Sequence, residues 1–461
     1  MPPRKAAAAT PATAAAAAAS EHFRALAVKT EGDSEKERGP SLATFEIADV
    51  DLCVVNALRR AVMADVPTVA IAFEPTAPRA ERAAGIQFFK NTGVLHTEFL
   101  GHRVSMVPLG FDEHQIAGFD PALYKLVLKV KNKGDKVLDV TTRDFQVLDQ
   151  AGAELAQLRD QLFPPSAITG DHVLLARLKP GANNEGEEIS LEARARLGTG
   201  REHARWSPVS RCFLRYKVDP AAFERSLAAK LAAAGVAEGD EGSEAIRRQH
   251  AALDGQREYF KNEHGEASVF EFEVKSETRL RPAYLVLQAF RALSDRVRRM
   301  RTDIEAIVAG SPGVEDDDDV GAGWGSAQPM QQQQQQQVVD GVTVNSIANM
   351  DDFYEVTVRG DDHTLGNMVQ GLLYRHWVRE GGAQLVSFIG YHMPHPLEGD
   401  IVFKVKCAKA GADVRELLID GLAWVLRYLR ELEDEWAGFT GQATKAAVGG
   451  GGATRGWAAN F

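Results

Sequence analysis

The same order of predicted elements occurs twice along this chain, and this quasi-repeat restricts the possible folds more than any other feature of the sequence. In each copy an apolar run, at residues 42–47 or 353–358, leads through an acidic turn into a predicted helix. A second apolar run follows each helix, at residues 66–73 and 385–391. Because short apolar runs bounded by turns are typical of strands, we expect strand, helix and strand in each copy.

Each copy then ends with a predicted strand and a long helix. Residues 268–274 and 400–406 alternate between apolar and polar side chains, as half-buried strands do. The helix after each strand carries apolar residues at spacings of three and four, which places them on one face. They include Leu287, Phe290, Leu293 and Val297 in the first helix, and Leu418, Leu422, Val425 and Leu429 in the second. Neither copy closes a core well alone, so we predict an α+β fold in which the two copies pack as an intramolecular pseudo-dimer.

Composition separates the predicted folded units from segments that are expected to lack structure. An Ala-rich tail (1–40), a linker with acidic and glutamine runs (309–349) and a C-terminal tail (438–461) have too few apolar residues to offset the entropy cost of folding. The folded units are a discontinuous first dimerisation domain (41–109 and 208–308), a mostly β inserted domain (110–207) and a second dimerisation domain (350–437). Residues 233–262 are expected to form a helical excursion or a loop. A flexible linker of about 40 residues spans roughly 35 Å, which lets the two domains meet.

Charge and cysteine content exclude several classes of protein. The formal net charge is −11, whereas a chain that holds long nucleic acids by itself usually carries a basic field. Any contact with DNA or RNA is therefore expected to be local or made through partners. The cysteines Cys53, Cys212 and Cys407 form no CxxC pair, so there is no local metal signature, and a reducing compartment is expected. No run of about 18 apolar residues occurs, so we predict no membrane span.

The sequence contains no motif of a catalytic site. His96, Glu98 and His102 lie in the segment HTEFLGH, where the two histidines are six positions apart. A zinc protease needs its histidines four positions apart on one helix face. The acidic run at residues 316–319 lies in the predicted linker, whereas a catalytic metal needs carboxylates on a rigid turn. We therefore predict no catalytic residue, no metal site and no cofactor.

The long helix of the first copy is strongly basic. Its arginines are Arg291, Arg296, Arg298, Arg299 and Arg301. One interpretation is a solvated helix face, which is the common fate of such runs. The other is contact with an acidic partner or a phosphate, and the sequence leaves both open.

Several motifs, in order, resemble one family. NALRR at 56–60, VPTVAI at 66–71, NTGVLH at 91–96, EFLGHR at 98–103, VPL at 107–109 and GREHARWSP at 200–208 resemble the alpha-like subunits of RNA polymerases. These are bacterial alpha, its archaeal D-type counterpart and the third-largest subunit of eukaryotic polymerase II. In the second copy, DHTLGN at 362–367 and GYHMPHPL at 390–397 resemble the smaller partner, which is the archaeal L-type protein and its eukaryotic counterpart.

The resemblance implies a structural role in DNA-templated transcription. In this family the two subunits form a heterodimer that nucleates assembly and holds the two large subunits, which carry the catalytic magnesium. The expected partners are therefore the largest and second-largest polymerase subunits, with small zinc-binding subunits as further candidates. DNA and RNA would be contacted only through the complex. Fusion of the pair resembles the arrangement in large DNA viruses, which leaves the nucleus, a viral factory and packaging in the virion as alternatives for location.

The resemblance also implies roles for individual residues. Asn56, Arg59, Arg60, His102, Arg103, Glu202, His203 and Trp206 are assigned to the interface with the large subunits. Paired arginines suit such a face because guanidinium groups bind carboxylates in a bidentate manner. His363 and Asn367 are assigned to the interface between the two copies, with a local role at the start of their helix as the alternative. Many relatives carry a cysteine cluster in the inserted domain, but no cysteine lies between Cys53 and Cys212 here.

Two other classes of function remain as alternatives. One is an enzyme whose site is assembled from distant residues, which nucleotidyl transfer by the isolated chain would reveal. The other is a sequence-specific DNA-binding regulator with an internal pseudo-dimer. The net charge of −11 and the lack of a recognisable reading helix count against the regulator.

Overall fold

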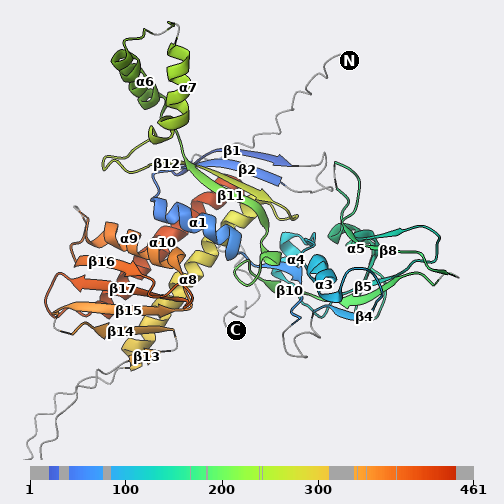
Figure 1. Ribbon diagram of the computed structural model, residues 1–461. Helices are drawn as coiled ribbons and strands as arrows, with labels where there is room; N and C mark the ends of the chain where they lie inside the picture. Colours follow the sequence, from blue (N-terminus) through green and yellow to red (C-terminus); the bar gives the residue numbers. More distant parts are fainter. Residues whose placement is uncertain are drawn as a thin grey trace, which may run out of the picture.

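A computed structural model shows two sheet-and-helix units side by side, an inserted domain beside them and a helical hairpin that projects from the first unit (Figure 1). The structure describes residues 20–30, 41–75, 85–166, 168–182, 185–237, 239–240, 242–310, 337–339, 341–348, 350–379 and 382–442. None of the helices in these ranges has both the length and the apolar character needed to cross a membrane.

The first unit is a four-stranded antiparallel sheet covered by two helices. The strand order is β1-β2-β12-β11, with β1 Phe23–Thr30, β2 Ser41–Ala48, β12 Val269–Ser276 and β11 Val209–Tyr216. The helices are α1 Leu52–Ala64 and α8 Pro282–Gly310. Strands β2 and β12 bury every second residue, as their alternating sequence predicts. Pro282 begins α8, where a first-turn proline costs no hydrogen bond.

The second unit repeats this plan with one additional strand. Its order is β13-β14-β15-β17-β16, with β13 Gln337–Val339, β14 Val342–Ser346, β15 Phe353–Arg359, β17 Asp400–Cys407 and β16 Val386–His392. Helices α9 His363–Trp377 and α10 Val414–Thr440 correspond to α1 and α8. The side chains of Asp362 and Asp413 accept hydrogen bonds at the starts of α9 and α10, so both helices begin at a capping aspartate.

The strand orders correct one expected correspondence between the copies. Residues 66–73 contain β3 Thr68–Ile71, which pairs with β10 Ala195–Gly198 and lies outside the sheet of the first unit. The position that β16 occupies in the second unit is taken by β11 in the first. An apolar run indicates a buried strand but not the strand with which it pairs. The position of residues 66–73 after the helix therefore did not predict the sheet to which they belong.

The inserted domain begins earlier than residue 110. Its main sheet has the order β4-β9-β5-β7, and its first strand, β4 Gln87–Asn91, comes from the range assigned to the first unit. The other strands are β9 Glu188–Ala193, β5 Lys125–Lys131 and β7 Phe145–Leu148, and β6 Leu138–Thr141 pairs with β8 Leu174–Leu178. Short helices are α3 Thr97–Ser105, α4 Glu113–Ala117, α5 Ala156–Leu162, η1 Thr142–Asp144 and η3 Ala204–Trp206.

A helical hairpin connects β11 to β12. It consists of α6 Pro220–Ala234 and α7 Ser243–Leu253, followed by the short η4 Gly255–Arg257. Of the two alternatives for residues 233–262, the helical one is therefore correct. Gly235 ends α6 with a positive φ of 68°, a conformation that glycine adopts without strain.

Three strands lie in segments that were expected to lack structure. β1 falls within residues 1–40, and β13 and β14 fall within residues 309–349. Each pairs within its own sheet and also packs on the other unit: β1 contacts α10 of the second unit, and β13 and β14 contact α8 of the first. Composition measures only the apolar content of a segment, so it does not predict a strand that packs against a distant part of the chain. The acidic run at 316–319, most of the glutamine run and the tail beyond residue 442 lie outside the described residues.

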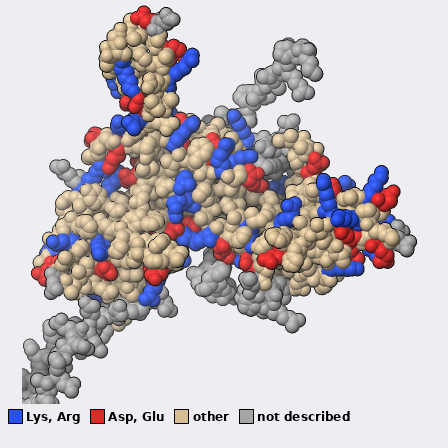
Figure 2. Space-filling model, viewed as in Figure 1, with Lys and Arg blue, Asp and Glu red and all other residues tan. Residues whose placement is uncertain are grey.

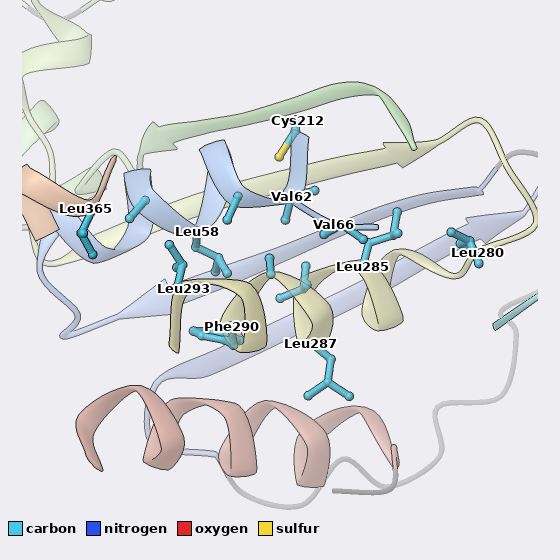
Figure 3. Close-up of a cluster of buried hydrophobic side chains, with 14 of the residues drawn as sticks. Leu58, Val62, Val66, Cys212, Leu280, Leu285, Leu287, Phe290, Leu293 and Leu365 are labelled. Carbon is cyan, nitrogen blue, oxygen red and sulfur yellow. The ribbon is translucent and has the colours of Figure 1, made fainter. Parts of the chain in front are cut away.

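The two units share one hydrophobic core. A single cluster of buried residues runs from Phe23 in β1 to Phe439 in α10. Figure 3 shows Leu58 and Val62 of α1 directed towards α8, whereas Leu287 projects from α8 towards the helix below it. Separate cores would leave the facing sides of α8 and α10 exposed, so the pair behaves as one folded body.

Candidate functional site

The contact between the long helices α8 and α10 forms the centre of the junction between the units. These helices run side by side, and the four predicted apolar residues on each are all buried. The eight residues are Leu287, Phe290, Leu293 and Val297 of α8, and Leu418, Leu422, Val425 and Leu429 of α10. Each helix also reaches the sheet of the other unit, since α8 contacts β13 and β14 and α10 contacts β1.

Aromatic side chains close one end of this junction. Phe23 of β1 lies with its ring centroid 5.0 Å from that of Trp436 in α10 and 6.3 Å from that of Phe290 in α8. The Trp436 Nε1 donates a hydrogen bond of 2.9 Å to the Ala283 carbonyl of the first unit. The indole therefore gives both apolar area and a fixed orientation to the contact.

Helices α1 and α9 approach each other closely at Gly371. A Cβ atom at Gly371 would lie 2.8 Å from the Cys53 Sγ of the first unit, so only glycine fits here without a shift. Burial raises the pKa of the Cys53 thiol to about 12, and burial raises that of Cys212 to about 12 as well. Both thiols are therefore protonated at neutral pH and unsuited to nucleophilic attack or metal binding.

A buried arginine lies at the other end of the junction. Arg296 of α8 is 5% exposed and pairs with three carboxylates: Asp65 after α1, and Asp361 and Asp362 before α9. Its Nη1 lies 2.9 Å from Asp65 Oδ2, and its Nη2 lies 2.8 Å from Asp362 Oδ1. One guanidinium thus joins the first unit to the second through charge-assisted hydrogen bonds.

Two further arginines complete this cluster. Arg60 of α1 donates from Nε to Thr364 Oγ1 at 2.7 Å and lies 3.3 Å from Asp362 Oδ2. Arg201, on the loop that leaves the inserted domain, lies 2.9 Å from Asp65 Oδ1 and 3.3 Å from Asp362 Oδ2. We call Arg60, Arg201, Arg296, Asp65, Asp361 and Asp362 the junction cluster. Its three cations balance its three anions, so the burial of Arg296 leaves no uncompensated charge.

The junction cluster shifts the ionisation of its members. Burial alone would raise the pKa of Asp362, but the hydrogen bonds and the charge of Arg296 outweigh burial and hold that pKa well below its usual range. Burial alone would lower the pKa of Arg296, but the charges of Asp361 and Asp65 and hydrogen bonds outweigh burial and raise it. Both groups stay charged at neutral pH, and the cluster ties the first unit, the second unit and the inserted domain together.

Three of the predicted large-subunit residues lie on the outer side of α1. Asn56, Arg59 and Arg60 are partly exposed there. Arg59 donates from Nε to Asn56 Oδ1 at 3.0 Å, whereas Arg60 points across the junction into the cluster. Figure 2 shows Lys and Arg side chains gathered near the middle of this face, where α1 and β11 lie in Figure 1. Arg60 therefore has a role within the chain that the sequence did not suggest.

The other predicted large-subunit residues divide into exposed and internal positions. Glu202 is exposed and lies 3.0 Å from Arg196, and His203 accepts a hydrogen bond from the Arg205 backbone. Trp206 is only 1% exposed, and its Nε1 donates to the Arg196 carbonyl at 3.2 Å. A direct contact between Trp206 and a partner is therefore excluded in this conformation, because the indole fills the core beside β3.

The two predicted large-subunit residues on helix α3, His102 and Arg103, contact neighbouring parts of the chain. His102 packs edge-on against Phe73, with ring centroids 5.2 Å apart. Arg103 donates to the carbonyls of Leu174 and Leu175, at 2.9 Å and 3.1 Å, and so anchors α3 to β8. His96, from the rejected zinc-protease pattern, accepts a hydrogen bond from the Glu98 backbone at the start of α3. The described residues contain no group of three or more His, Cys, Asp or Glu side chains placed to hold a metal ion.

The two remaining interface predictions, in α9, differ from the apolar ones. His363 is exposed and its Nδ1 lies 3.3 Å from Tyr391 Oη of the same unit, while Asn367 is partly buried. For His363 the structure thus gives a contact within its own unit.

Four residues of the junction cluster were not predicted to lie at the interface between the copies. They are Asp65, Arg201, Asp361 and Asp362, and no local sequence pattern distinguishes them from other charged residues. Arg296 and Arg291 were noted only as members of a basic helix, and Arg291 in fact pairs with Glu433 of α10 at 2.7 Å.

Comparison with known sequences gives the same division of the chain. A sequence profile described as the RNA polymerase Rpb3/Rpb11 dimerisation domain matches residues 44–297, more than half of the chain. A second profile of the same description matches residues 354–435. The chain belongs to the RNA polymerase Rpb3/Rpb11 dimerisation-domain family. The two matches fall on the first and second units, so this family member contains both halves of a dimer in one polypeptide.

Individual relatives come from plants, fungi and archaea. The chain is 28% identical over 199 residues to subunit 3 of RNA polymerases II, IV and V of Arabidopsis thaliana, covering 40% of this chain and 56% of that protein. It is 29% identical over 189 residues to subunit RPAC1 of polymerases I and III of Saccharomyces cerevisiae, covering 36% and 51%. It is 26% identical over 189 residues to subunit Rpo3 of Methanobrevibacter smithii, covering 41% and 56%. The chain spans about half the length of these relatives.

Proposed function

We propose that this chain is a non-catalytic subunit of a multisubunit DNA-directed RNA polymerase and joins the two large catalytic subunits. The observation that carries the proposal is that two Rpb3/Rpb11 dimerisation units lie in one chain and share one core. Relatives from several kingdoms are named as subunits of such polymerases. Fusion supplies both halves of the platform at a fixed one-to-one ratio and a high effective concentration.

The outer side of α1 is the centre of the proposed docking face. Arg59 is partly exposed there, and among the ion pairs of the described residues it has no carboxylate partner. A large subunit could therefore offer a carboxylate to its guanidinium in a bidentate contact. His102, Arg103, Glu202 and His203 extend this face towards the inserted domain, and Trp206 supports the loop from inside.

The same role predicts where and with what the chain acts. Its expected partners are the largest and second-largest polymerase subunits, with small zinc-binding subunits as further candidates. We infer that it acts within the cell, in the nucleus or in a viral factory, with virion packaging if the source is a virus. Template DNA and transcript would meet the catalytic subunits that this chain holds.

Affinity purification of the tagged chain from its native source, followed by mass spectrometry, tests the proposal. We expect two very large polypeptides in one-to-one ratio with the chain, and RNA synthesis by the purified complex on a DNA template. Recovery of the chain without large partners would refute the assembly role. Nucleotidyl transfer by the isolated chain would instead favour an enzyme, and sequence-dependent DNA binding by it would favour a regulator.

A further inference from the structure

The outer faces of the two sheets occupy equivalent places in the pseudo-dimer but differ in charge. In the first unit, outer side chains of β2, β12 and β11, and of the residue after β11, form ion pairs with each other. These pairs are Arg211 with Glu273, Arg215 with Glu271 and Lys217 with Glu46. Each of these cations has a carboxylate neighbour, so that face offers little free charge to a ligand.

In the second unit the strand position of a lysine lies between the positions of two phenylalanines. The register of the sheet sets Lys406 of β17 directly opposite Phe353 of β15 on one side and Phe388 of β16 on the other. The two rings meet edge to face with centroids 6.0 Å apart, and Phe388 is 48% exposed. Lys406 is also exposed, and the ion pairs found among the described residues include none for it. This row presents aromatic surface beside an exposed lysine, and we call it the aromatic platform.

The next row of the sheet extends the platform. Lys404 lies opposite Glu355 on β15 and Gly390 on β16, and its Nζ is 4.0 Å from Glu355 Oε2, the outer limit of an ion pair. Gly390 has no side chain, and a Cβ atom there would lie 3.0 Å from the Phe388 Cζ. The Phe388 ring therefore lies along the strand, over Gly390, rather than pointing away from the sheet. Strand β16 is also the last strand of its sheet.

We propose that the outer face of the second unit's sheet binds single-stranded nucleic acid, with bases stacked on Phe388 and Phe353 and phosphates at Lys404 and Lys406. Exposed aromatic rings on an open antiparallel sheet bind single strands because every base has a face that stacks on a ring. Lysines beside the rings neutralise the phosphates that separate stacked bases. This activity is additional to the assembly role and does not depend on it.

The chemistry of the face favours a nucleic acid over an acidic protein segment. A protein partner gains most of its affinity by inserting apolar side chains into pockets, whereas a base needs only one open ring and a nearby cation. The net charge of −11 for the whole chain predicts that binding is weak, local and strongly dependent on salt. Binding should be independent of sequence, since the platform offers stacking and charge but few groups that read base edges.

Fluorescence anisotropy with the purified full-length chain and a fluorescein-labelled oligouridylate of about 12 nucleotides tests the proposal. We expect saturable binding at low salt. Phe388→Ala should raise Kd by roughly tenfold because one stacking surface is lost. The double change Lys404→Ala and Lys406→Ala should weaken binding and reduce the slope of log K against log salt by roughly one to two, for two lost phosphate contacts.

The first unit supplies a matched control. Lys275 of β12 holds the sheet position equivalent to Lys406, but it forms an ion pair with Glu277 at 3.3 Å. Lys275→Ala should leave Kd unchanged. Circular dichroism and thermal unfolding show whether each variant is folded. We expect all of them to fold, because the changed side chains lie on the outer face of a sheet. The proposal would be overturned if the folded wild-type chain did not bind the oligonucleotide, or if Lys275→Ala weakened binding as much as the Lys404 and Lys406 changes. It would also be overturned if polyglutamate bound equally tightly and Phe388→Ala weakened that binding, since the ligand would then be an acidic protein.

Discussion

Arg60 of the first unit lies 3.3 Å from Asp362 of the second, and Arg375 of the second lies 2.8 Å from Asp51 of the first. Asp51 and Asp362 are the residues at which α1 and α9 begin. Each helix thus sends an arginine to the start of its counterpart, so the pseudo-two-fold relation reaches individual side chains. Since each ion pair needs both units, neither unit forms it alone.

Replacement of Arg296 by alanine should destabilise the whole pseudo-dimer. The change would leave Asp65, Asp361 and Asp362 close together with only Arg60 and Arg201 as counter-charges. Loss of one partner from a buried charge cluster typically costs about 3–5 kcal/mol. Urea unfolding followed by circular dichroism should show this loss in the free energy of unfolding.

Arg298→Ala is the control for this prediction. Arg298 lies on the same helix, is exposed and pairs only locally, with Asp295. An exposed pair of this kind contributes at most about 1 kcal/mol. If the two variants unfolded with equal free energies, the junction cluster would not be a main source of stability.

The junction cluster should also make stability depend on acid. The pKa of Asp362 is held below its usual range in the folded state, so its interactions stabilise the fold above the ordinary aspartate pKa of about 3.9. This contribution is lost as pH falls through the lowered pKa. The difference in unfolding free energy between wild type and Asp362→Asn should therefore shrink as pH is lowered from about 7 to about 3. A difference that stays constant with pH would contradict the ion-pair account.

The close approach of α1 and α9 should be sensitive to a single methyl group. In an open helix site, Gly→Ala stabilises by roughly 0.5–1 kcal/mol, but at Gly371 the new Cβ would lie 2.8 Å from Cys53 Sγ. We expect Gly371→Ala to destabilise by about 1–3 kcal/mol, the usual cost of overpacking. In a Cys53→Ala background most of this loss should disappear. Additive effects in the double-mutant cycle would show that the two residues do not limit the approach of the helices.

Strand β1 should contribute strongly to stability although its sequence lies in an apparent tail. Phe23→Ala removes a ring that is 2% exposed and packs on Trp436, so a loss of about 3–5 kcal/mol is expected. Val28 on the same strand is 48% exposed, and Val28→Ala should change stability by no more than about 0.5 kcal/mol. Thermal unfolding of both variants tests this: if β1 is packed, only Phe23→Ala lowers the unfolding temperature, and if β1 is loose, neither change does.

The sequence predicted the parts of the fold that leave a local pattern. The stripes on α8 and α10 are periodic, so their burial could be predicted from spacing alone, and the motif residues of both units identified the family. Strands β1 and β14 could not be predicted because α10 and α8 of the opposite units support them. A local pattern carries no information about such support.

The candidate site shows the same limit. The three carboxylates of the junction cluster come from two turns about 300 positions apart, and nothing in either turn marks the residues as interacting. Arg60 and Trp206 were recognised from motifs, but a motif does not distinguish an outward contact from an inward one. Arg60 pairs within the chain although it is partly exposed, and Trp206 is buried, so Trp206 can support the proposed docking face only from the interior.

The division of labour between Arg59 and Arg60 gives the sharpest test of the docking face. Arg59→Ala should reduce the recovery of large polymerase subunits with the tagged chain and leave its thermal unfolding unchanged, because its contacts are local. Arg60→Ala should lower both recovery and stability, because Arg60 joins α1 to Thr364 and Asp362. Arg59→Lys keeps the charge but loses bidentate geometry, so it should recover only part of the binding. Full recovery of large subunits with folded Arg59→Ala would place the docking face elsewhere on the molecule.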